Sequence, residues 1–394
     1  MASINIFVPG FSPRKFSGGL LAVFEYANGL TRAGHNVRVI PMEASPSPEW
    51  FRPEFELLNQ HGSTLKAAAV QSLQALLKAD KALLKNSVKG GIDEIVYRLS
   101  RWSSYIYRRA RQIHGLRGLV PPSDVTIATS YHTALPVYLY GSGAKFYFCQ
   151  HYEPYFDVES DFPELARIDA LSTYFLPENS FIANSSWLSS KLRELTCKDV
   201  PVCTNAIDHT VYFPEGDPPD HREKFVVVSY GGRLARWKGF QEAAEAIRIA
   251  RQSIPHLEWR VFGDALLPPN NSIASYVPLG FITGQRLRRA YSEAHILLST
   301  SWYESFPLYP LEAMACGAAV VTTPYGTEDY AQHLFNAYVV PPRDPEAAAR
   351  ALLHLYEDAE MRSNLAKQGL VEAKKHTWEK SVQRMQSLLF QTAS

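Results

Sequence analysis

The sequence predicts an α/β protein with two doubly wound domains. Short apolar, β-branched segments alternate with longer segments whose apolar residues recur at helical spacing, and this alternation occurs twice along the chain. A stretch rich in proline and charged residues, 213–224, separates the two series and is the expected linker. Near-continuous apolar strands are typical of parallel sheets that helices cover on both faces. We therefore expect two Rossmann-like domains that face each other across a cleft, with ligand at the carboxyl ends of the strands.

The first domain is expected to span residues 1–212. Its strands are predicted at Ile4–Val8, Asn36–Pro41, Asp124–Ala128, Phe146–Cys149 and Phe181–Ala183. Its helices are predicted at Gly19–Ala33 and Ser186–Leu195, where apolar side chains lie three or four residues apart.

The second domain is expected to span residues 225–376. Its strands are predicted at Phe225–Gly231, Glu258–Phe262, Ile296–Ser299, Ala319–Thr322 and Ala337–Val340. Its helices are predicted at Phe240–Arg251, Gly284–Glu293, Pro310–Cys316 and Pro345–Leu355. A terminal helix at 377–394 carries one apolar face and is expected to pack back on the first domain.

A basic helical insert near residues 63–118 interrupts the first domain. Between residues 66 and 117 the chain carries eleven Lys or Arg but only three acidic residues. One interpretation is that this amphipathic segment contacts an anionic membrane or an anionic acceptor. The other is an ordinary helical insert with a solvated basic face, because surface helices commonly carry Lys and Arg.

Composition excludes several classes of protein. The chain has 394 residues, with 40 Lys or Arg against 39 Asp or Glu, so the whole-chain charge of +1 does not favour a nucleic-acid partner. The four cysteines form no C-x-x-C pair and are expected to be buried thiols. The amino terminus lacks the pattern of a signal peptide, and no apolar stretch is long enough to span a membrane. We therefore expect a cytoplasmic protein, peripheral to the inner membrane face if the insert binds lipid.

Two glycine-containing loops follow strands and precede helices. Gly18 and Gly19 would let backbone amides approach an anion at a helix amino terminus, although a plain tight turn would use the same residues. The second loop, Tyr230–Gly239, contains Arg233 and Lys238 after the first strand of the second domain. Because Arg and Lys neutralise phosphate oxygens, we interpret this loop as a diphosphate site rather than a solvated basic turn.

The segment Ser301–Gly317 carries the most informative pattern. Glu304 and Glu312 lie eight residues apart, and Pro310 is expected to open a helix at its first position, with Glu312 in the first turn. The amides of Leu308 and Tyr309 would then point toward a phosphate. Glu312 could accept hydrogen bonds from two ribose hydroxyls and Glu304 from a sugar ring. In a purely structural interpretation, Glu312 only favours the helix dipole and Glu304 is a surface residue.

These motifs together resemble the family 4 retaining glycosyltransferases of the GT-B fold. The likeness rests on Gly232-Arg233-x₄-Lys238-Gly239, on Glu304-x₇-Glu312, and on Ala313-Met-Ala-Cys-Gly317. It continues in the segments Asn205–Asp208, Leu279–Ile282, Pro324–Glu328 and Asn336–Pro341. The run Gln150–Phe156 is similar to a subset that includes bacterial surface-polysaccharide rhamnosyltransferases. Two departures are Ala206 in place of a glycine and Glu304-Ser-Phe-Pro307 in place of the commoner E-G-x-G.

The resemblance implies a role for each matching residue. Arg233 and Lys238 would hold the donor diphosphate, with the amides of Leu308 and Tyr309 on its phosphates. Glu312 would bind the ribose, and Glu304 would contact the donor sugar. The backbone near Phe281 and Ile282 would contact the nucleotide base. Gly18 and Gly19 would approach the phosphates or the acceptor. His151 would be the active-site histidine.

The implied activity is transfer of a sugar from a nucleotide-sugar donor to an acceptor hydroxyl, with retention and without a metal or other cofactor. The acceptor would be a carbohydrate or a lipid-linked molecule in polysaccharide or glycolipid synthesis. Two alternatives remain: another GT-B-type enzyme, such as a nucleotide-sugar epimerase or a phosphorylase, and a non-catalytic nucleotide-sugar-binding scaffold.

Overall fold

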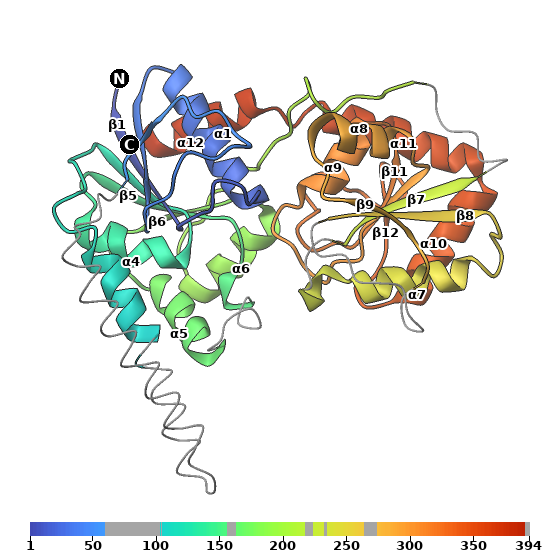
Figure 1. Cartoon of the computed structure of the whole chain (residues 1–394), viewed down its shortest axis with the longest axis horizontal. Coiled ribbons are helices and arrows are strands. Elements are labelled where there is room, and N and C mark those ends of the chain that lie inside the picture. The colour runs from blue at the N-terminus through green and yellow to red at the C-terminus, as the bar shows by residue number, and fades with distance from the viewer. Residues whose placement is uncertain are drawn as a thin grey trace, which may run out of the picture. The chain divides into compact units, whose positions relative to one another are not determined.

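The computed structural model describes residues 1–59, 103, 105–155, 163–216, 224–231, 235–263 and 274–390. Most of the basic insert and Arg233 of the predicted diphosphate loop lie outside these residues. The chain divides into two compact units, Met1–Phe181 and Ile182–Ser394, and Figure 1 labels the elements of each. The described residues form two six-stranded sheets.

The first sheet is parallel in every strand pair that is described and has the order β3-β2-β1-β4-β5-β6. Its strands are β1 (Ser3–Val8), β2 (Asn36–Pro41), β3 (Glu56–Leu57), β4 (Val125–Ala128), β5 (Ala144–Cys149) and β6 (Ser180–Ala183). All four residues of β4 and five of six in β1 are buried, as their central positions in the sheet require.

Helices connect these strands on both faces of the sheet. They are α1 (Gly18–Arg32), α4 (Tyr131–Tyr140), α5 (Pro163–Thr173) and α6 (Ser186–Thr196), and a further helix runs over residues 105–114. In Figure 1, α1 lies on one side of the first sheet, and α4 and α5 lie on the other. Helix α1 begins after Ser17, whose hydroxyl accepts a hydrogen bond from the Leu20 amide at 3.5 Å.

The second sheet repeats this plan with the order β12-β11-β10-β7-β8-β9. Its strands are β7 (Phe225–Tyr230), β8 (Leu257–Phe262), β9 (Val277–Gly280), β10 (Ile296–Leu298), β11 (Ala319–Thr322) and β12 (Tyr338–Val339). The strand order reverses between β7 and β10, so their carboxyl ends flank a topological switch point, where α/β sheets bind ligands.

The helices of the second unit form two apolar layers on this sheet. They are η2 (Arg236–Lys238), α7 (Phe240–Ala250), α8 (Gly284–Ser292), α9 (Leu308–Ala315), α10 (Pro345–Glu357), α11 (Ala359–Ala373) and α12 (Trp378–Phe390). Helices α7 and α10 cover one face, where Trp259 is fully buried, and α8 and α9 cover the other face, where Tyr291 is fully buried. This two-sided burial explains why β7 and β10 are continuous apolar runs.

The predicted α/β architecture is confirmed, but several elements were not predicted. Strand β3 has two residues, and β9 is a partly exposed edge strand, so neither produces a clear apolar run. Helix α4 contains Pro136, which is a poor helix signal. Of the four cysteines, Cys197 is exposed rather than buried, since it ends α6 in a left-handed conformation.

The terminal helix is present as α12. The backbone carbonyl of Ser381 accepts a hydrogen bond from the Cys203 thiol, and Arg384 donates to the carbonyl of Val202. Residues 202 and 203 follow α6 in the second of the two compact units. The predicted domain boundaries, 1–212 and 225–376 around the linker, stay a prediction.

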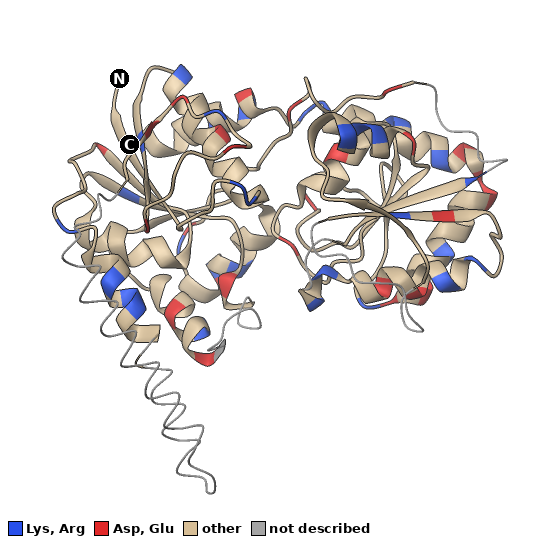
Figure 2. Ribbon diagram, viewed as in Figure 1, with Lys and Arg blue, Asp and Glu red and all other residues tan. Residues whose placement is uncertain are grey.

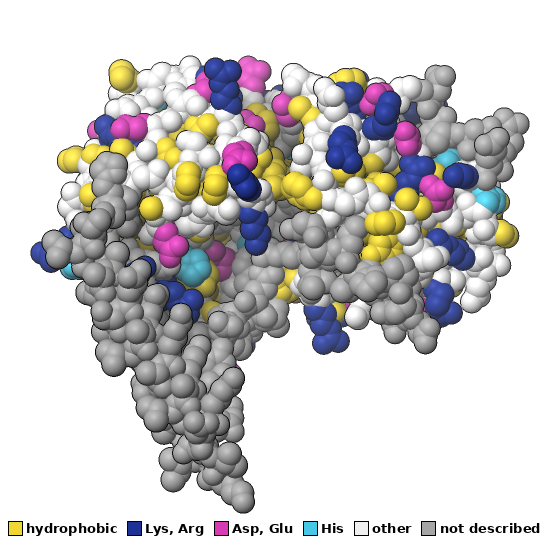
Figure 3. All heavy atoms as spheres, in the orientation of Figure 1, with side chains coloured by type: hydrophobic (Ala, Val, Ile, Leu, Met, Phe, Trp, Pro, Cys, Tyr) yellow, Lys and Arg dark blue, Asp and Glu magenta, His cyan; other side chains and the backbone are white. Residues whose placement is uncertain are grey.

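Charged side chains are spread over the described surface rather than segregated by sign. Figure 2 shows Lys and Arg gathered on the helix over residues 105–114, whereas both signs alternate over the helices of the second unit. The face drawn in Figure 3 likewise intersperses basic, acidic and apolar side chains on the second unit. Among the described helices, none combines the length and apolar character needed to cross a bilayer.

Candidate active site

Two of the predicted donor residues, Lys238 and Glu304, meet at the carboxyl ends of β7 and β10. Lys238 ends η2, the short helix that follows β7. Glu304 lies in the loop after β10, and α9 carries Leu308, Tyr309 and Glu312. Because parallel strands present their carboxyl ends at one edge, segments far apart in sequence meet here.

Lys238 and Glu304 form a buried ion pair. The Lys238 Nζ lies 2.6 Å from Oε1 of Glu304, and the two side chains are only 16% and 9% exposed. The Ser301 hydroxyl donates to the same Glu304 oxygen at 3.2 Å. A lysine and a carboxylate held this way offer one cationic and one hydrogen-bond-accepting group to a ligand that displaces their mutual contact.

The loops that carry this pair are packed backbone against backbone. Gly239 adopts a left-handed conformation with φ of +68°, and a Cβ there would stand 1.9 Å from the carbonyl oxygen of Thr300. The Thr300 hydroxyl donates to the Gly239 carbonyl at 2.7 Å. The Trp302 amide donates to the carbonyl of Trp237 at 2.7 Å. The glycine of the Lys238-Gly239 motif therefore permits the close approach that positions Lys238 beside Glu304.

Helix α9 begins earlier than the sequence suggested. Pro307 is its amino-terminal cap and Leu308 its first residue, so Pro310 is the third helical residue and Glu312 lies beyond the first turn. Pro310 fits there because the first amides of a helix have no intrahelical acceptor in any case. The amides of Leu308 and Tyr309 are the first two of α9, as an anion site at a helix amino terminus requires.

The side chain of Tyr309 joins the site, a contribution that sequence reasoning missed. Its hydroxyl lies 3.0 Å from the hydroxyls of both Ser299 and Ser301. Its ring stacks on that of Tyr230 at 5.7 Å between centroids, and the Lys238 ammonium lies 5.9 Å from the Tyr230 ring centre. The only sequence signal was an aromatic residue between the two glutamates, which is too weak to assign a contact.

Glu312, on α9, is buried and contacts α8. The Tyr291 hydroxyl donates to Oε2 of Glu312 at 3.2 Å, and the ring centre of Tyr212 lies 6.4 Å from that of Tyr291. Burial raises the pKa of Glu312 to about 7, although the neighbouring hydroxyls of Tyr291 and Tyr212 favour the ionised form. Neither tyrosine was predicted, because each lies far from Glu312 in the sequence.

The residues predicted to meet the nucleotide base lie in a separate loop. Phe281 and Ile282 follow the edge strand β9, which β8 separates from β7. Phe281 is 51% exposed, whereas Ile282 is buried in the apolar layer under α8.

In the first unit, the glycine pair and the predicted histidine come from adjacent loops. Gly18 and Gly19 are the first two residues of α1 rather than a turn before it. A Cβ added to Gly19 would lie 3.9 Å from Oε1 of Gln150. A Cβ added to Gly18 would have no other atom within 4 Å. His151 follows Gln150 just beyond β5. The structure thus brings Gly19 close to the loop that carries His151.

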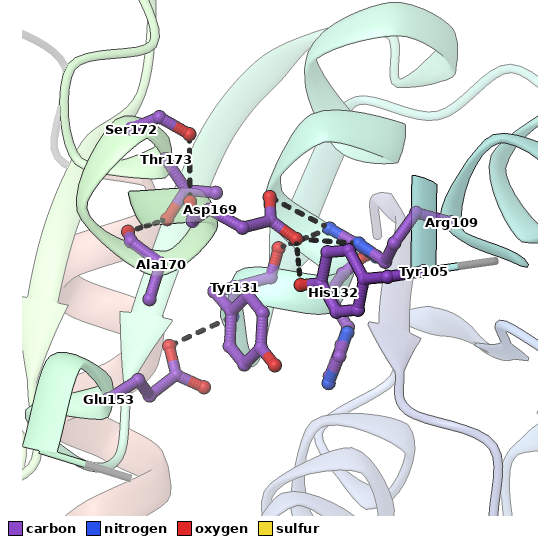
Figure 4. Close-up of polar contacts among 9 residues, drawn as sticks. All are labelled: Tyr105, Arg109, Tyr131, His132, Glu153, Asp169, Ala170, Ser172 and Thr173. Carbon is purple, nitrogen blue, oxygen red and sulfur yellow. Dashed lines mark hydrogen bonds and ion pairs between the residues drawn. The ribbon is translucent and has the colours of Figure 1, made fainter. Parts of the chain in front are cut away.

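Glu153 is the anchor of this loop. Its Oε2 accepts a hydrogen bond from the Tyr131 amide at 2.8 Å, and the Tyr147 hydroxyl donates to the same oxygen. Burial raises the pKa of Glu153 to about 8, against the effect of these two hydrogen bonds. Glu153 therefore ties the loop to the amino terminus of α4, as Figure 4 shows for Tyr131.

A buried ion pair stands beside Glu153 (Figure 4). Arg109 Nε donates to Oδ2 of Asp169 at 2.7 Å, and the guanidinium also donates to the carbonyls of Tyr131 and His132. Burial, reinforced by the Arg109 charge, lowers the pKa of His132 to about 4. His132 is therefore neutral near pH 7 and is not a general acid there.

Over the described ranges, no cluster of His, Cys, Asp and Glu is arranged to hold a metal ion.

Comparison with known proteins assigns a family to the second unit. Residues 225–358 match the family described as Glycosyl transferases group 1. The second unit therefore carries a group 1 glycosyltransferase domain. Lys238, Glu304 and Glu312 all lie within the matched range.

Curated relatives match parts of the chain. The O-antigen biosynthesis protein RfbC of Myxococcus xanthus is 26% identical over 281 residues, 70% of this chain and 21% of the relative. The D-inositol 3-phosphate glycosyltransferase of Salinispora tropica is 30% identical over 181 residues, 41% of this chain and 38% of the relative. The chain thus matches between about a fifth and two fifths of the length of these two relatives.

Solved structures share the whole fold. Sucrose-phosphate synthase from Thermosynechococcus elongatus has a TM-score of 0.68 at 16% identity, covering 98% of both chains. HepE of Anabaena, solved with UDP and glucose, has a TM-score of 0.66 at 16% identity, covering 99% of both chains. TarM of Staphylococcus aureus, solved with UDP, has a TM-score of 0.69 at 10% identity and covers 99% of this chain and 100% of that one. These similarities establish that the chain has the GT-B fold.

Proposed function

We propose that the protein transfers a glycosyl group from a nucleotide-sugar donor to an acceptor hydroxyl. The observation that carries the proposal is the buried pair of Lys238 and Glu304, which Ser301 links to Tyr309 of α9, inside the group 1 glycosyltransferase domain. Lys238 and the first amides of α9 would bind the diphosphate of the donor, and Glu304 would hydrogen-bond the donor sugar. HepE and TarM, which share the fold, were solved with UDP, and this supports a nucleotide-sugar donor.

The chemical step that we propose retains configuration at the anomeric carbon. The bond from that carbon to the diphosphate breaks while the bond to the acceptor oxygen forms on the same face, and the acceptor proton passes to a phosphate oxygen. Lys238, Arg233 and the α9 amides neutralise the charge that develops on the leaving diphosphate, so the step requires no metal ion. His151 supports the donor sugar in the transition state. Transfer with inversion, or loss of activity in EDTA, would contradict this mechanism.

The acceptor that we propose is a carbohydrate or a lipid-linked molecule. The relatives include an O-antigen biosynthesis protein and a poly(glycerol-phosphate) α-glucosyltransferase of Bacillus subtilis, and these names support a role in polysaccharide or glycolipid synthesis. We also propose peripheral contact between the basic segment 66–117 and an anionic membrane. Flotation with phosphatidylglycerol vesicles that persists after its Lys and Arg are neutralised would contradict that contact.

Nucleotide binding is the first test. Thermal-shift measurements with UDP-, GDP-, dTDP- and ADP-sugars should identify one nucleotide that stabilises the protein, by about 2.7 kcal/mol at a hundredfold excess over its Kd. Lys238→Ala should abolish the shift. Lys224→Ala is a matched control, because Lys224 pairs with Glu258 at the other end of β7. If no nucleotide sugar stabilises the protein, the proposed function is wrong.

Product analysis separates this function from the two alternatives. A transferase releases free nucleotide only as acceptor is glycosylated, whereas an epimerase converts the donor without acceptor and a scaffold binds it unchanged. His151→Ala should abolish transfer but leave donor binding intact, because the nucleotide contacts that we propose lie in the second unit.

A further inference from the structure

Two arginine side chains from separate loops gather on the indole ring of Trp302. The guanidinium carbon of Arg343 lies 3.8 Å from the ring centre of Trp302, and that of Arg236 lies 5.5 Å from it. Arg236 belongs to η2 after β7, Trp302 to the loop after β10, and Arg343 to the loop between β12 and α10. The carboxyl ends of three strands of one sheet therefore bring the two arginines together.

The indole that supports the arginines is itself held in place. Its Nε1 donates a hydrogen bond to Oε1 of Glu242, on α7, at 2.7 Å, and the Trp302 amide donates to the carbonyl of Trp237 at 2.7 Å. Both the side chain and the backbone of Trp302 are thus fixed. Because a guanidinium is attracted to the face of an aromatic ring, this fixed support restricts the positions that the two arginine side chains adopt.

The hydrogen-bond donors of both arginines remain available to a ligand. Arg236 and Arg343 are exposed, and among the residues that the structure describes neither guanidinium has a hydrogen-bond or carboxylate partner. A guanidinium that lies over a ring keeps its N–H groups at its rim, where they can bind two oxygens of a phosphate or carboxylate. Arg343 also has a left-handed backbone, with φ of +60°, so the turn by itself does not favour an arginine.

This arginine cluster, Arg236, Trp302 and Arg343, is separate from the pair of Lys238 and Glu304. The pair is linked to α9 by the Ser301 hydroxyl, which bonds both to Glu304 and to the first turn of that helix. The indole of the cluster is instead linked to α7, and α7 and α9 cover opposite faces of the sheet. The same edge of the sheet therefore carries two sets of cationic groups.

We propose that Arg236 and Arg343 form an anion-binding site, distinct from the donor diphosphate site, that takes a phosphate or carboxylate group. Two like charges held on one ring repel each other, and a bound anion relieves that repulsion. The site goes beyond the proposed function, which uses neither arginine. Its ligand is either a charged group carried by a sugar substrate or a free inorganic anion, since both present the same oxygens.

The indole N–H resonance of Trp302 provides the readout, because this ring carries both arginines. In nitrogen-15-labelled protein the resonance is assigned by its loss in Trp302→Phe. Titration at low ionic strength with inorganic phosphate, glucose 6-phosphate and glucuronate should shift it, whereas glucose should not. Tighter binding of glucose 6-phosphate or glucuronate assigns the site to a substrate group, and tighter binding of phosphate assigns it to a free anion.

Substitutions locate the anion within the second unit. Arg236→Gln and Arg343→Gln should each weaken the anions about tenfold, since each removes a charged double donor. Lys238→Ala should leave these affinities unchanged, because Lys238 belongs to the donor site. Arg248→Gln is the matched control and should also change nothing, since Arg248 is an exposed arginine of α7 that pairs with Glu245.

Each contrary result overturns the site. If Arg248→Gln weakens the anions as much as Arg343→Gln, the effect comes from general surface charge. If Lys238→Ala abolishes the shift, the anion binds at the donor site instead. If wild-type protein shows no shift, or if the shift survives both arginine substitutions, the cluster does not bind anions. None of these results contradicts the proposed function, which nucleotide-sugar binding tests separately, and melting temperatures identify any variant that fails to fold.

Discussion

At the scale of single residues, the two glutamates of the glycosyltransferase domain have different environments. Glu304 is paired with a lysine, whereas Glu312 faces only neutral hydroxyl groups. A partner of opposite charge compensates the burial of Glu304. Two phenols compensate only part of the cost for Glu312, so burial dominates and raises its pKa to about 7. Glu312 therefore changes its protonation state near neutral pH.

Nucleotide affinity should depend on the ionisation of Glu312. Ribose hydroxyls donate to an ionised carboxylate, so affinity should rise severalfold as pH increases from 6 to 8 through the pKa of about 7. The facing groups Tyr212, Tyr291 and Cys316 all have raised pKa values, and none changes charge in this interval.

Titration calorimetry of wild type and Glu312→Gln across this range is the measurement. The phosphate of the ligand titrates identically with both proteins, so the difference between them isolates Glu312. Parallel pH profiles would contradict the prediction.

At the scale of elements, close backbone contacts and buried pairs hold the loops that carry the site. In the second unit, the turn after η2 packs directly against the loop after β10. In the first unit, Arg109 and Asp169 connect the helix over residues 105–114 to α5, and Arg109 also reaches two carbonyls of α4. Both arrangements tolerate little change. The contact at Gly239 has no space for a larger side chain, and the buried Arg109 has no other carboxylate among the described residues to pair with if Asp169 is replaced.

Gly239→Ala should destabilise the protein by more than about 2 kcal/mol and weaken nucleotide binding. The added Cβ would stand 1.9 Å from the Thr300 carbonyl oxygen, so the backbone next to Lys238 must shift. Gly34→Ala is the matched control, because Gly34 also has a positive φ, +89°, with nothing within 4 Å. It should cost about 1 kcal/mol. Urea unfolding would measure both, and equal losses would show that the contact at Gly239 relaxes freely.

Asp169→Ala should destabilise the first unit by about 3 kcal/mol, because it leaves the Arg109 guanidinium buried without its carboxylate. Glu178→Ala removes the carboxylate of a comparable pair with Lys145, but Glu178 is 64% exposed. That control should cost less than about 1 kcal/mol. Chemical denaturation of both variants checks the difference, and similar losses would mean that burial of the pair has little effect.

At the scale of the whole molecule, the buried carboxyls link stability to pH. Glu153 in the first unit has its pKa raised to about 8, and Glu312 in the second has its pKa raised to about 7, against an ordinary value of 4.5. Between pH 4.5 and 8 the folded protein therefore holds protons that the unfolded chain releases. Since the folded state binds more protons, these two groups make stability fall as pH rises through this range.

The melting temperature should fall between pH 4.5 and 8, and Glu153→Gln should flatten that fall. Glutamine keeps the acceptor oxygen for the Tyr131 amide but does not ionise. Calorimetric scans at several pH values provide the measurement, with Glu178→Gln as an exposed control. If the melting temperature of Glu153→Gln falls as much as that of the wild type, groups other than Glu153 cause the dependence on pH.

Local patterns in the sequence predicted the architecture and the two loops that carry Lys238 and Glu304. Apolar runs predicted the central strands because a buried parallel strand must be apolar on both faces. Lys238 and Glu304 were each predicted in a loop that follows a strand, and the structure brings the two loops together because the carboxyl ends of parallel strands lie at one edge of the sheet. The start of α9 was misplaced, since Pro310 is acceptable anywhere in a first turn and so does not identify the first residue.

Only the tertiary structure decided how the key carboxylates are held. Tyr212, Tyr291 and Glu312 come from three separate segments, and nothing in their spacing predicts that they meet. In the same way, no local pattern predicts that Glu153 reaches the amino terminus of α4. The sequence by itself determined which segments become strands and helices, because burial and periodicity are local properties of the chain. The structure decided which side chains touch, and hence their pKa values, because contacts depend on strand order and on how the helices pack.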